Sequence, residues 1–200
     1  MKDVTQQMLT DTFYLCVSWI LYYTSHSILA TTKAKTYFSF IGAYYRFAYS
    51  SISILLLIPL SIFHHQLNTP SLIKTSTLFT VIAYFGIVIG LVLQWQTFKG
   101  YSTAEFLGYQ AFTRVKEKEH TLFITGMNKY VRHPIYFSLL IILLSFLIVS
   151  PSFHNFAFVG ISISYLFIGS YFEEKKLKQQ FGQTYINYSK KVKRIIPFII

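Results

Sequence analysis

The fold is decided by residues 134–172, which read PIYFSLLIILLSFLIVSPSFHNFAFVGISISYLFIGSYF and contain no Asp, Glu, Lys or Arg. A transmembrane helix needs roughly 20 largely apolar residues, so this stretch is long enough for two. Ser150 and Pro151 divide it, and a proline stops one helix and favours the first turn of the next. The sequence therefore predicts two membrane spans, about Pro134 to Val149 and Ser152 to Phe172, joined as a tight hairpin.

The remainder of the chain has the same apolar character. Across all 200 residues of the chain, 53% are hydrophobic and 12% are charged, whereas a soluble domain carries about 25% charged residues. The mean hydropathy is +0.45. Three further stretches are long enough to span a bilayer: about Leu9 to Ala30, Tyr45 to Phe63 and Leu78 to Trp95.

These segments predict an all-α integral membrane protein with about five transmembrane helices. We expect one membrane domain over residues 1–200, with the first three spans in residues 1–97 and the carboxyl-terminal hairpin in residues 98–200. The tail after Phe172 predicts a cytoplasmic amphipathic helix, because apolar residues recur every three or four positions among lysines. These apolar residues are Leu177, Phe181, Tyr185, Tyr188 and Val192.

The loop between Gln96 and His133 is too polar to span a membrane. Ser102 and Glu105 have the spacing of a helix capping box. The loop therefore predicts a short interfacial helix, whose apolar side would carry Phe106, Leu107, Tyr109 and Phe112.

The net charge is +11, and the basic residues lie between the apolar stretches. This distribution favours membrane lipids or an anionic ligand as partners and argues against nucleic acid. When the carboxyl terminus is placed in the cytoplasm, only Lys2 and Lys74 of the 18 basic residues fall outside. The positive-inside rule then predicts an external amino terminus and a cytoplasmic carboxyl terminus.

Soluble nucleotide-binding motifs and zinc-binding Cys or His clusters are absent from the sequence, so we predict no metal site. The informative residues are Arg132 and His133, directly before a helix that starts at Pro134, and Glu173 and Glu174 at the end of the partner span. Opposite charges thus meet at one depth at the membrane edge, where an unpaired charge is costly. Two interpretations stay open: an interfacial salt bridge, or a ligand site at the positive end of a helix dipole.

The sequence contains two motifs, H-T-L-x-x-x-G-x-x-x-x-x-R-H-P-x-Y from His120 to Tyr136 and E-E-x-x-L-x-x-x-F-G-x-x-Y-x-x-Y from Glu173 to Tyr188. Together they resemble the motifs of the integral membrane methyltransferases. That group includes isoprenylcysteine carboxyl methyltransferases and phospholipid N-methyltransferases. The amino-terminal segment from His26 to Ala30 is similar to bacterial methanethiol S-methyltransferase. The resemblance implies an enzyme of a bacterial inner membrane that uses S-adenosylmethionine.

The resemblance also implies site residues. Arg132 and Glu174 are the candidate catalytic residues, although His133, Glu173 and Glu174 remain equal candidates for deprotonating an acceptor. The implied cofactor-binding residues are His120, Thr121, Leu122, Phe123, Asn128, Tyr130, His133, Pro134, Ile135, Tyr136 and Glu173.

The acceptor implied by the resemblance is a small or lipid-like molecule, with a thiol favoured. Prenylcysteine enzymes hold the substrate carboxylate with an arginine at the position of Gly169, and a carboxylate would lack that charged partner here. The alternatives are isoprenylcysteine carboxyl or phospholipid N-methylation. Two rivals from other classes are a nicotinamide-dependent membrane reductase and a non-catalytic membrane scaffold.

Overall fold

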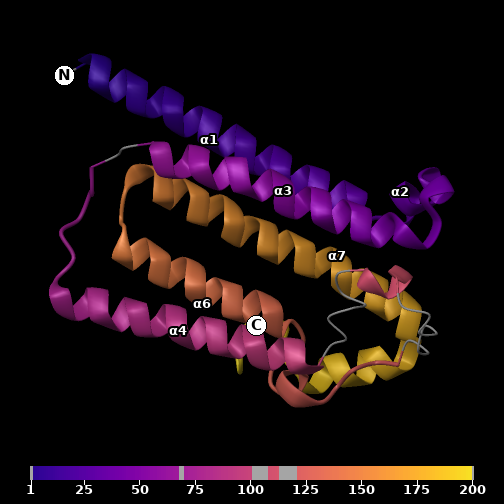
Figure 1. The fold of residues 1–200 in the computed structure, drawn as a ribbon. Coiled ribbons are helices and arrows are strands. Elements are labelled where there is room, and N and C mark those ends of the chain that lie inside the picture. The colour runs from indigo at the N-terminus through magenta and orange to yellow at the C-terminus, as the bar shows by residue number, and fades with distance from the viewer. Residues whose placement is uncertain (1, 68–69, 101–107, 113–120, 200) are drawn as a thin grey trace. The chain divides into compact units, whose positions relative to one another are not determined.

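The computed structural model describes residues 2–67, 70–100, 108–112 and 121–199, and it is built from helices (Figure 1). Within these residues, β-type pairing is limited to isolated bridges between Ser71 and Ser152 and between Val131 and Lys193. The elements in chain order are α1 (Lys2–Leu29), α2 (Thr32–Tyr37), η1 (Ser39–Tyr44), α3 (Tyr45–Gln66), α4 (Thr77–Gly100), η2 (Tyr109–Phe112), η3 (Gly126–Lys129), α6 (Pro134–Val149) and α7 (Phe153–Lys191).

The predicted apolar stretches coincide with α1, α3, α4, α6 and α7. Three helical segments in the described residues are long and apolar enough to cross a membrane: Ser39–Gln66, Thr77–Lys99 and Phe153–Lys191. Helix α6 is apolar but has 16 residues. The prediction of an all-helical membrane protein is therefore confirmed, whereas the number of five spans stays a prediction.

The chain forms two compact units, and each draws on both halves of the sequence. The first unit consists of Met1–Ile73, Ser102–Lys116 and Pro151–Ile161. The second consists of Lys74–Tyr101, Glu117–Ser150 and Ser162–Ile200. Helix α7 belongs to both, with its first residues in the first unit and the remainder in the second.

In the first unit, polar side chains join apolar helices through hydrogen bonds. The Nδ1 atom of His26 on α1 lies 2.9 Å from the Ser53 hydroxyl on α3, and the Tyr45 hydroxyl donates to the Leu29 carbonyl oxygen over 2.8 Å. Helices α1 and α3 pack together. Since no water competes inside a bilayer, such pairs help to fix how membrane helices associate.

The expected interfacial helix falls only partly within the described residues. Ser102, Glu105, Phe106 and Leu107 lie outside them. Tyr109 and Phe112 form the 3₁₀ turn η2, and the Phe112 ring lies 4.9 Å from that of Phe47 on α3. The part that is described is therefore a short turn packed on the first unit, not an α-helix.

In the second unit, α4 and α6 lie side by side (Figure 1), and glycines permit their close approach. A Cβ atom added to Gly86 would lie 2.2 Å from the Ser145 Oγ, and one added to Gly90 would lie 2.5 Å from the Ile142 Cγ1. The G-x-x-x-G motif of α4 thus forms a helix contact within the chain. The Ser138 hydroxyl on α6 donates a further hydrogen bond to the Gln94 side-chain oxygen on α4.

Gly90→Ala should destabilise the protein, because the added methyl group overlaps the stiff side chain of Ile142 and approaches the Ser138 carbonyl oxygen. Overpacking of this kind typically costs about 1–3 kcal/mol. Gly160→Ala is the matched control, since a Cβ there meets nothing within 4 Å and alanine is the better helix former. Thermal unfolding in detergent should show a lower midpoint for Gly90→Ala alone; equal midpoints in the two variants would contradict the close contact.

Candidate functional site

The candidate site forms where the carboxyl-terminal tail returns to the segment that precedes α6. Gly182 interrupts α7 with a φ of 51° and a ψ of −128°, a conformation that favours glycine, and α7 changes direction near its yellow end (Figure 1). Beyond α7, the backbone N–H groups of Arg132 and His133 donate to the carbonyl oxygens of Lys193 and Arg194, each over 2.9 Å. The tail is therefore fixed against the start of α6.

The guanidinium of Arg132 connects the segment before α6 with Glu174 and with the end of α7. Its Nε and Nη2 donate to the two carboxylate oxygens of Glu174 over 2.8 and 2.9 Å. Its Nη1 donates to the carbonyl oxygen of Ser189 over 2.9 Å and also to that of Val192. Because the last carbonyls of a helix have no partner within the helix, Arg132 caps α7 while it neutralises Glu174.

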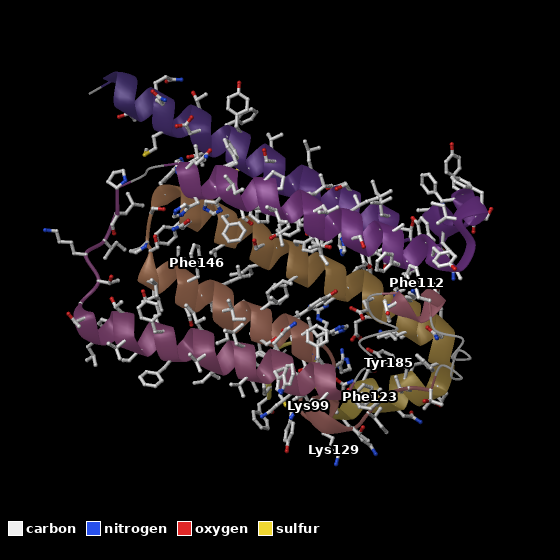
Figure 2. The ribbon with its side chains drawn as sticks, viewed as in Figure 1. Lys99, Phe112, Phe123, Lys129, Phe146 and Tyr185 are labelled. Atoms are coloured by element: carbon white, nitrogen blue, oxygen red, sulfur yellow. The ribbon has the colours of Figure 1, made fainter. Side chains whose placement is uncertain are left out.

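Glu174 is the buried centre of this arrangement, with 9% of its side chain exposed. Its Oε1 also accepts hydrogen bonds from the His133 Nε2 over 2.9 Å and from the Tyr185 hydroxyl over 2.6 Å; Tyr185 is labelled in Figure 2. A buried carboxylate is costly unless it is paired and hydrogen-bonded, and Glu174 meets both conditions. Its Oε1 accepts three of these hydrogen bonds and its Oε2 accepts one.

His133 lies buried between two carboxylates. Its Nε2 faces Glu174, and its Nδ1 lies 3.3 Å from the Glu173 Oε2. Only the imidazolium form donates from both ring nitrogens. Burial opposes protonation, but the carboxylates of Glu173 and Glu174 outweigh it and raise the pKa of His133 above its usual value. The site therefore favours a charged histidine.

Glu173 differs from its neighbour in exposure. Its side chain is 45% exposed, whereas that of Glu174 is 9% exposed. The Tyr136 hydroxyl interacts electrostatically with the Glu173 carboxylate, and the Tyr136 ring stacks on His133 with centroids 5.4 Å apart. A hypothetical Cβ on Gly169 would lie 3.6 Å from that same hydroxyl. Position 169, Tyr136 and Glu173 thus lie along one edge of the site.

The loop before Arg132 is held by Asn128, which is buried. Its side-chain Nδ2 donates to the Phe123 carbonyl oxygen over 2.7 Å, and its own carbonyl oxygen accepts a 2.6 Å hydrogen bond from the Tyr188 hydroxyl. The Tyr130 side chain is 63% exposed. Asn128 therefore connects the loop to the tail, whereas Tyr130 leaves an aromatic surface open.

Most of the predicted site residues lie either in a cluster at the start of α6 or in the loop before it. Arg132, His133, Tyr136, Glu173 and Glu174 form one connected cluster at the start of α6, where Pro134 is the first helical residue and Ile135 the second. Thr121, Leu122 and Phe123 precede η3 in the loop that Asn128 holds. His120 lies outside the described residues.

Tyr185 and Tyr188 belong to the site although the sequence does not predict them there. Tyr185 is 1% exposed and donates to Glu174, and Tyr188 donates to the Asn128 carbonyl oxygen. In the sequence, both contribute to the apolar periodicity of the residues after Phe172. Their place in the run that begins at Glu173 was the signal that could have identified them, since each carries a hydroxyl that needs a partner when it is buried.

Comparison of the chain with protein-family models, with curated proteins and with solved structures finds no match. The resemblance to membrane methyltransferases therefore depends on the motif residues alone. Residues of the two motif runs meet in the structure, because Arg132 and His133 of the first run contact Glu174 of the second.

Glu174→Ala should destabilise the protein strongly, because it leaves the buried Arg132 and His133 without their shared counter-charge. Removal of one member of a buried pair typically costs about 3–5 kcal/mol. Glu173→Ala removes a carboxylate that is 45% exposed, for which a loss below about 1 kcal/mol is expected. Reversible unfolding in mixed micelles would measure both, and equal losses would show that Glu174 is not the structural centre.

Proposed function

We propose that this chain is an S-adenosylmethionine-dependent membrane methyltransferase that acts on a small or lipophilic acceptor, with a thiol favoured. The observation that supports this proposal best is that the adjacent glutamates Glu173 and Glu174 differ in their partners and in their exposure. Glu174 satisfies Arg132, His133 and Tyr185, whereas Glu173 remains 45% exposed beside them. Glu173 also pairs with His133, but the exposed part of its carboxylate stays accessible to a ligand.

The residues of the site fit the cofactor chemically. S-adenosylmethionine supplies a methyl group on a sulfonium, together with an ammonium, a carboxylate, ribose hydroxyls and an adenine. Glu173 is suited to accept hydrogen bonds from the ammonium or a ribose hydroxyl. The first N–H groups of α6, which begins at Pro134, favour a carboxylate. The exposed ring of Tyr130 offers a surface for stacking.

In this proposal Arg132 and Glu174 act by positioning. The four described hydrogen bonds of the Arg132 guanidinium go to Glu174, Ser189 and Val192, and Glu174 is bound by three partners. Arg132 and Glu174 would hold His133 and Glu173 in place and keep the end of α7 bound to the segment before α6. Such support is needed because a displacement of about 1 Å can cost roughly a hundredfold in rate.

Methyl transfer from labelled S-adenosylmethionine to a panel of thiols, prenylcysteine analogues and phosphatidylethanolamine tests the proposal with the purified full chain. We expect saturable cofactor binding and transfer to at least one thiol. Glu173→Gln should weaken cofactor binding by at least about tenfold, roughly 1.4 kcal/mol, through loss of a charged hydrogen-bond acceptor.

Lys190→Gln is the matched control for Glu173→Gln, because it changes an exposed residue of the same helix by one charge. Its cofactor affinity should stay within about twofold of the original protein. Absence of S-adenosylmethionine binding by the unaltered protein would refute the proposal. Binding of NADPH instead would support the alternative of a nicotinamide-dependent membrane reductase.

The proposed preference for a thiol rests on Gly169. No cation is present at position 169 to pair with a substrate carboxylate, although the nearby Tyr136 hydroxyl shows that this position borders the site. A neutral thiol does not need such a partner. Once a base has taken its proton, the thiolate would attack the methyl carbon of the sulfonium, whose bond to sulfur breaks so that S-adenosylhomocysteine leaves.

Turnover of a small or lipophilic thiol should exceed that of a farnesylcysteine analogue by at least about tenfold in kcat/KM, or roughly 1.4 kcal/mol in barrier. Gly169→Arg should narrow this ratio by supplying a charge-assisted partner, and Gly169→Ala, whose methyl group makes ordinary contact with Tyr136, should leave it unchanged. A preference of the original protein for farnesylcysteine would contradict the assignment.

We also propose that the protein lies in a bacterial inner membrane through five spans, with its amino terminus outside and its carboxyl terminus in the cytoplasm. Five described helices at the predicted spans and the basic residues between them support this topology. Labelling of single cysteines placed at Pro70 and Lys190 tests it, because these positions should react from opposite sides.

A further inference from the structure

The second unit contains a basic pocket of about 640 Å³ beside the buried Glu174, within the size range of ligand sites, roughly 300–1,000 Å³. Its basic lining residues other than Arg132 are Lys175, Lys178, Lys193 and Arg194, here called the basic quartet. Tyr171, Glu174 and Ser189 complete the lining. The methyltransferase proposal gives no role to the basic quartet.

The charge of this pocket is not balanced by the residues that line it. Arg132 and Glu174 neutralise each other through two hydrogen bonds. Among the described residues, no carboxylate lies within ion-pair distance of the basic quartet. Four like charges around one cavity repel each other, and an anion that entered the pocket would relieve that repulsion.

The backbone and the helix hold the basic quartet in place. Lys175 and Lys178 are three residues apart on α7, so they lie on one face of the helix. The carbonyl oxygens of Lys193 and Arg194 accept hydrogen bonds from the backbone of Arg132 and His133. Because the four Cα positions are fixed, binding an anion requires ordering of side chains only, which lowers its entropic cost.

The position of the pocket along α7 favours a lipid over a soluble anion. Tyr171 lines it, and Tyr171 and Phe172 end the apolar part of the helix with 60% and 63% of their surfaces exposed. A phospholipid could place its phosphate among the basic quartet while its acyl chains lie along the apolar surface that precedes Phe172. A soluble phosphate would gain only the electrostatic part of this interaction.

We infer that the basic quartet binds the phosphate group of an anionic phospholipid at the membrane surface. The site holds the headgroup between α7 and the tail that follows it. The interaction is independent of methyl transfer, since it uses neither Glu173 nor the cofactor. It gives the segment after α7 a further attachment besides the backbone hydrogen bonds from Arg132 and His133 to Lys193 and Arg194.

The test measures lipid retention by native mass spectrometry of the full-length protein in micelles that contain phosphatidylglycerol and phosphatidylcholine in equal amounts, without S-adenosylmethionine. The original protein should retain phosphatidylglycerol preferentially. The variant Lys175→Gln/Lys178→Gln/Lys193→Gln/Arg194→Gln should reduce that preference by at least about tenfold, since it removes the charged hydrogen-bond donors that surround the phosphate in the pocket.

The matched control is Lys129→Gln/Lys176→Gln/Lys190→Gln/Lys191→Gln, which removes the same charge from exposed residues that do not line the pocket. It should keep its preference for phosphatidylglycerol within about twofold. The double variant Lys175→Gln/Lys178→Gln serves if the fourfold variant unfolds, and it should lose part of the preference. Equal losses in the pocket and control variants would overturn the inference, because the attraction would then be a property of overall charge.

Competition separates the two sources of phosphate. Glycerol 3-phosphate and inorganic phosphate, added at the concentration of the lipid, should not displace phosphatidylglycerol. Displacement by either soluble anion at equal concentration would overturn the assignment of the pocket to a lipid. Failure of S-adenosylmethionine to bind would leave these results unchanged, so the two proposals fail separately.

Discussion

The buried carboxylate of Glu174 is the constraint on which the second unit depends. It accepts hydrogen bonds from Arg132 and His133, which precede α6, and from Tyr185, which follows the break in α7 at Gly182. Arg132 extends the network to the last carbonyls of α7. A single anion thus connects three segments that are distant in sequence, and each segment leaves a charged or polar group unsatisfied if the others move away.

Sequence patterns predicted the apolar helices because the requirement for about 20 apolar residues is local and simple. The start of α6 at Pro134 and the break between α6 and α7 at Pro151 follow from the missing N–H group of proline. The G-x-x-x-G motif of Gly86 and Gly90 is compatible with a helix contact within the chain or between copies. The structure assigns it to the chain through Ile142 and Ser145, whose positions opposite α4 no pattern in the sequence reveals.

The candidate site could be predicted only in part. Its charged members were identified because opposite charges at one depth of a membrane need each other. Their division of roles was not predictable, since Glu173 and Glu174 are adjacent and chemically identical. They differ only because successive side chains of a helix point in different directions, one toward Arg132 and Tyr185 and the other toward Tyr136. The break at Gly182, which brings Tyr185 back, was likewise noted only as a motif residue.

The arrangement of charge explains how so basic a chain tolerates a buried ionic cluster. Arg132 and His133, whose pKa is raised by the two carboxylates, lie against Glu173 and Glu174, so each buried charge of the cluster has a partner of opposite sign. The excess positive charge then lies on the neighbouring exposed positions, such as Lys175 and Lys178. Because the same turns of α7 supply the buried anion and the exposed cations, the contacts that fix Glu174 also fix the backbone positions of Lys175 and Lys178.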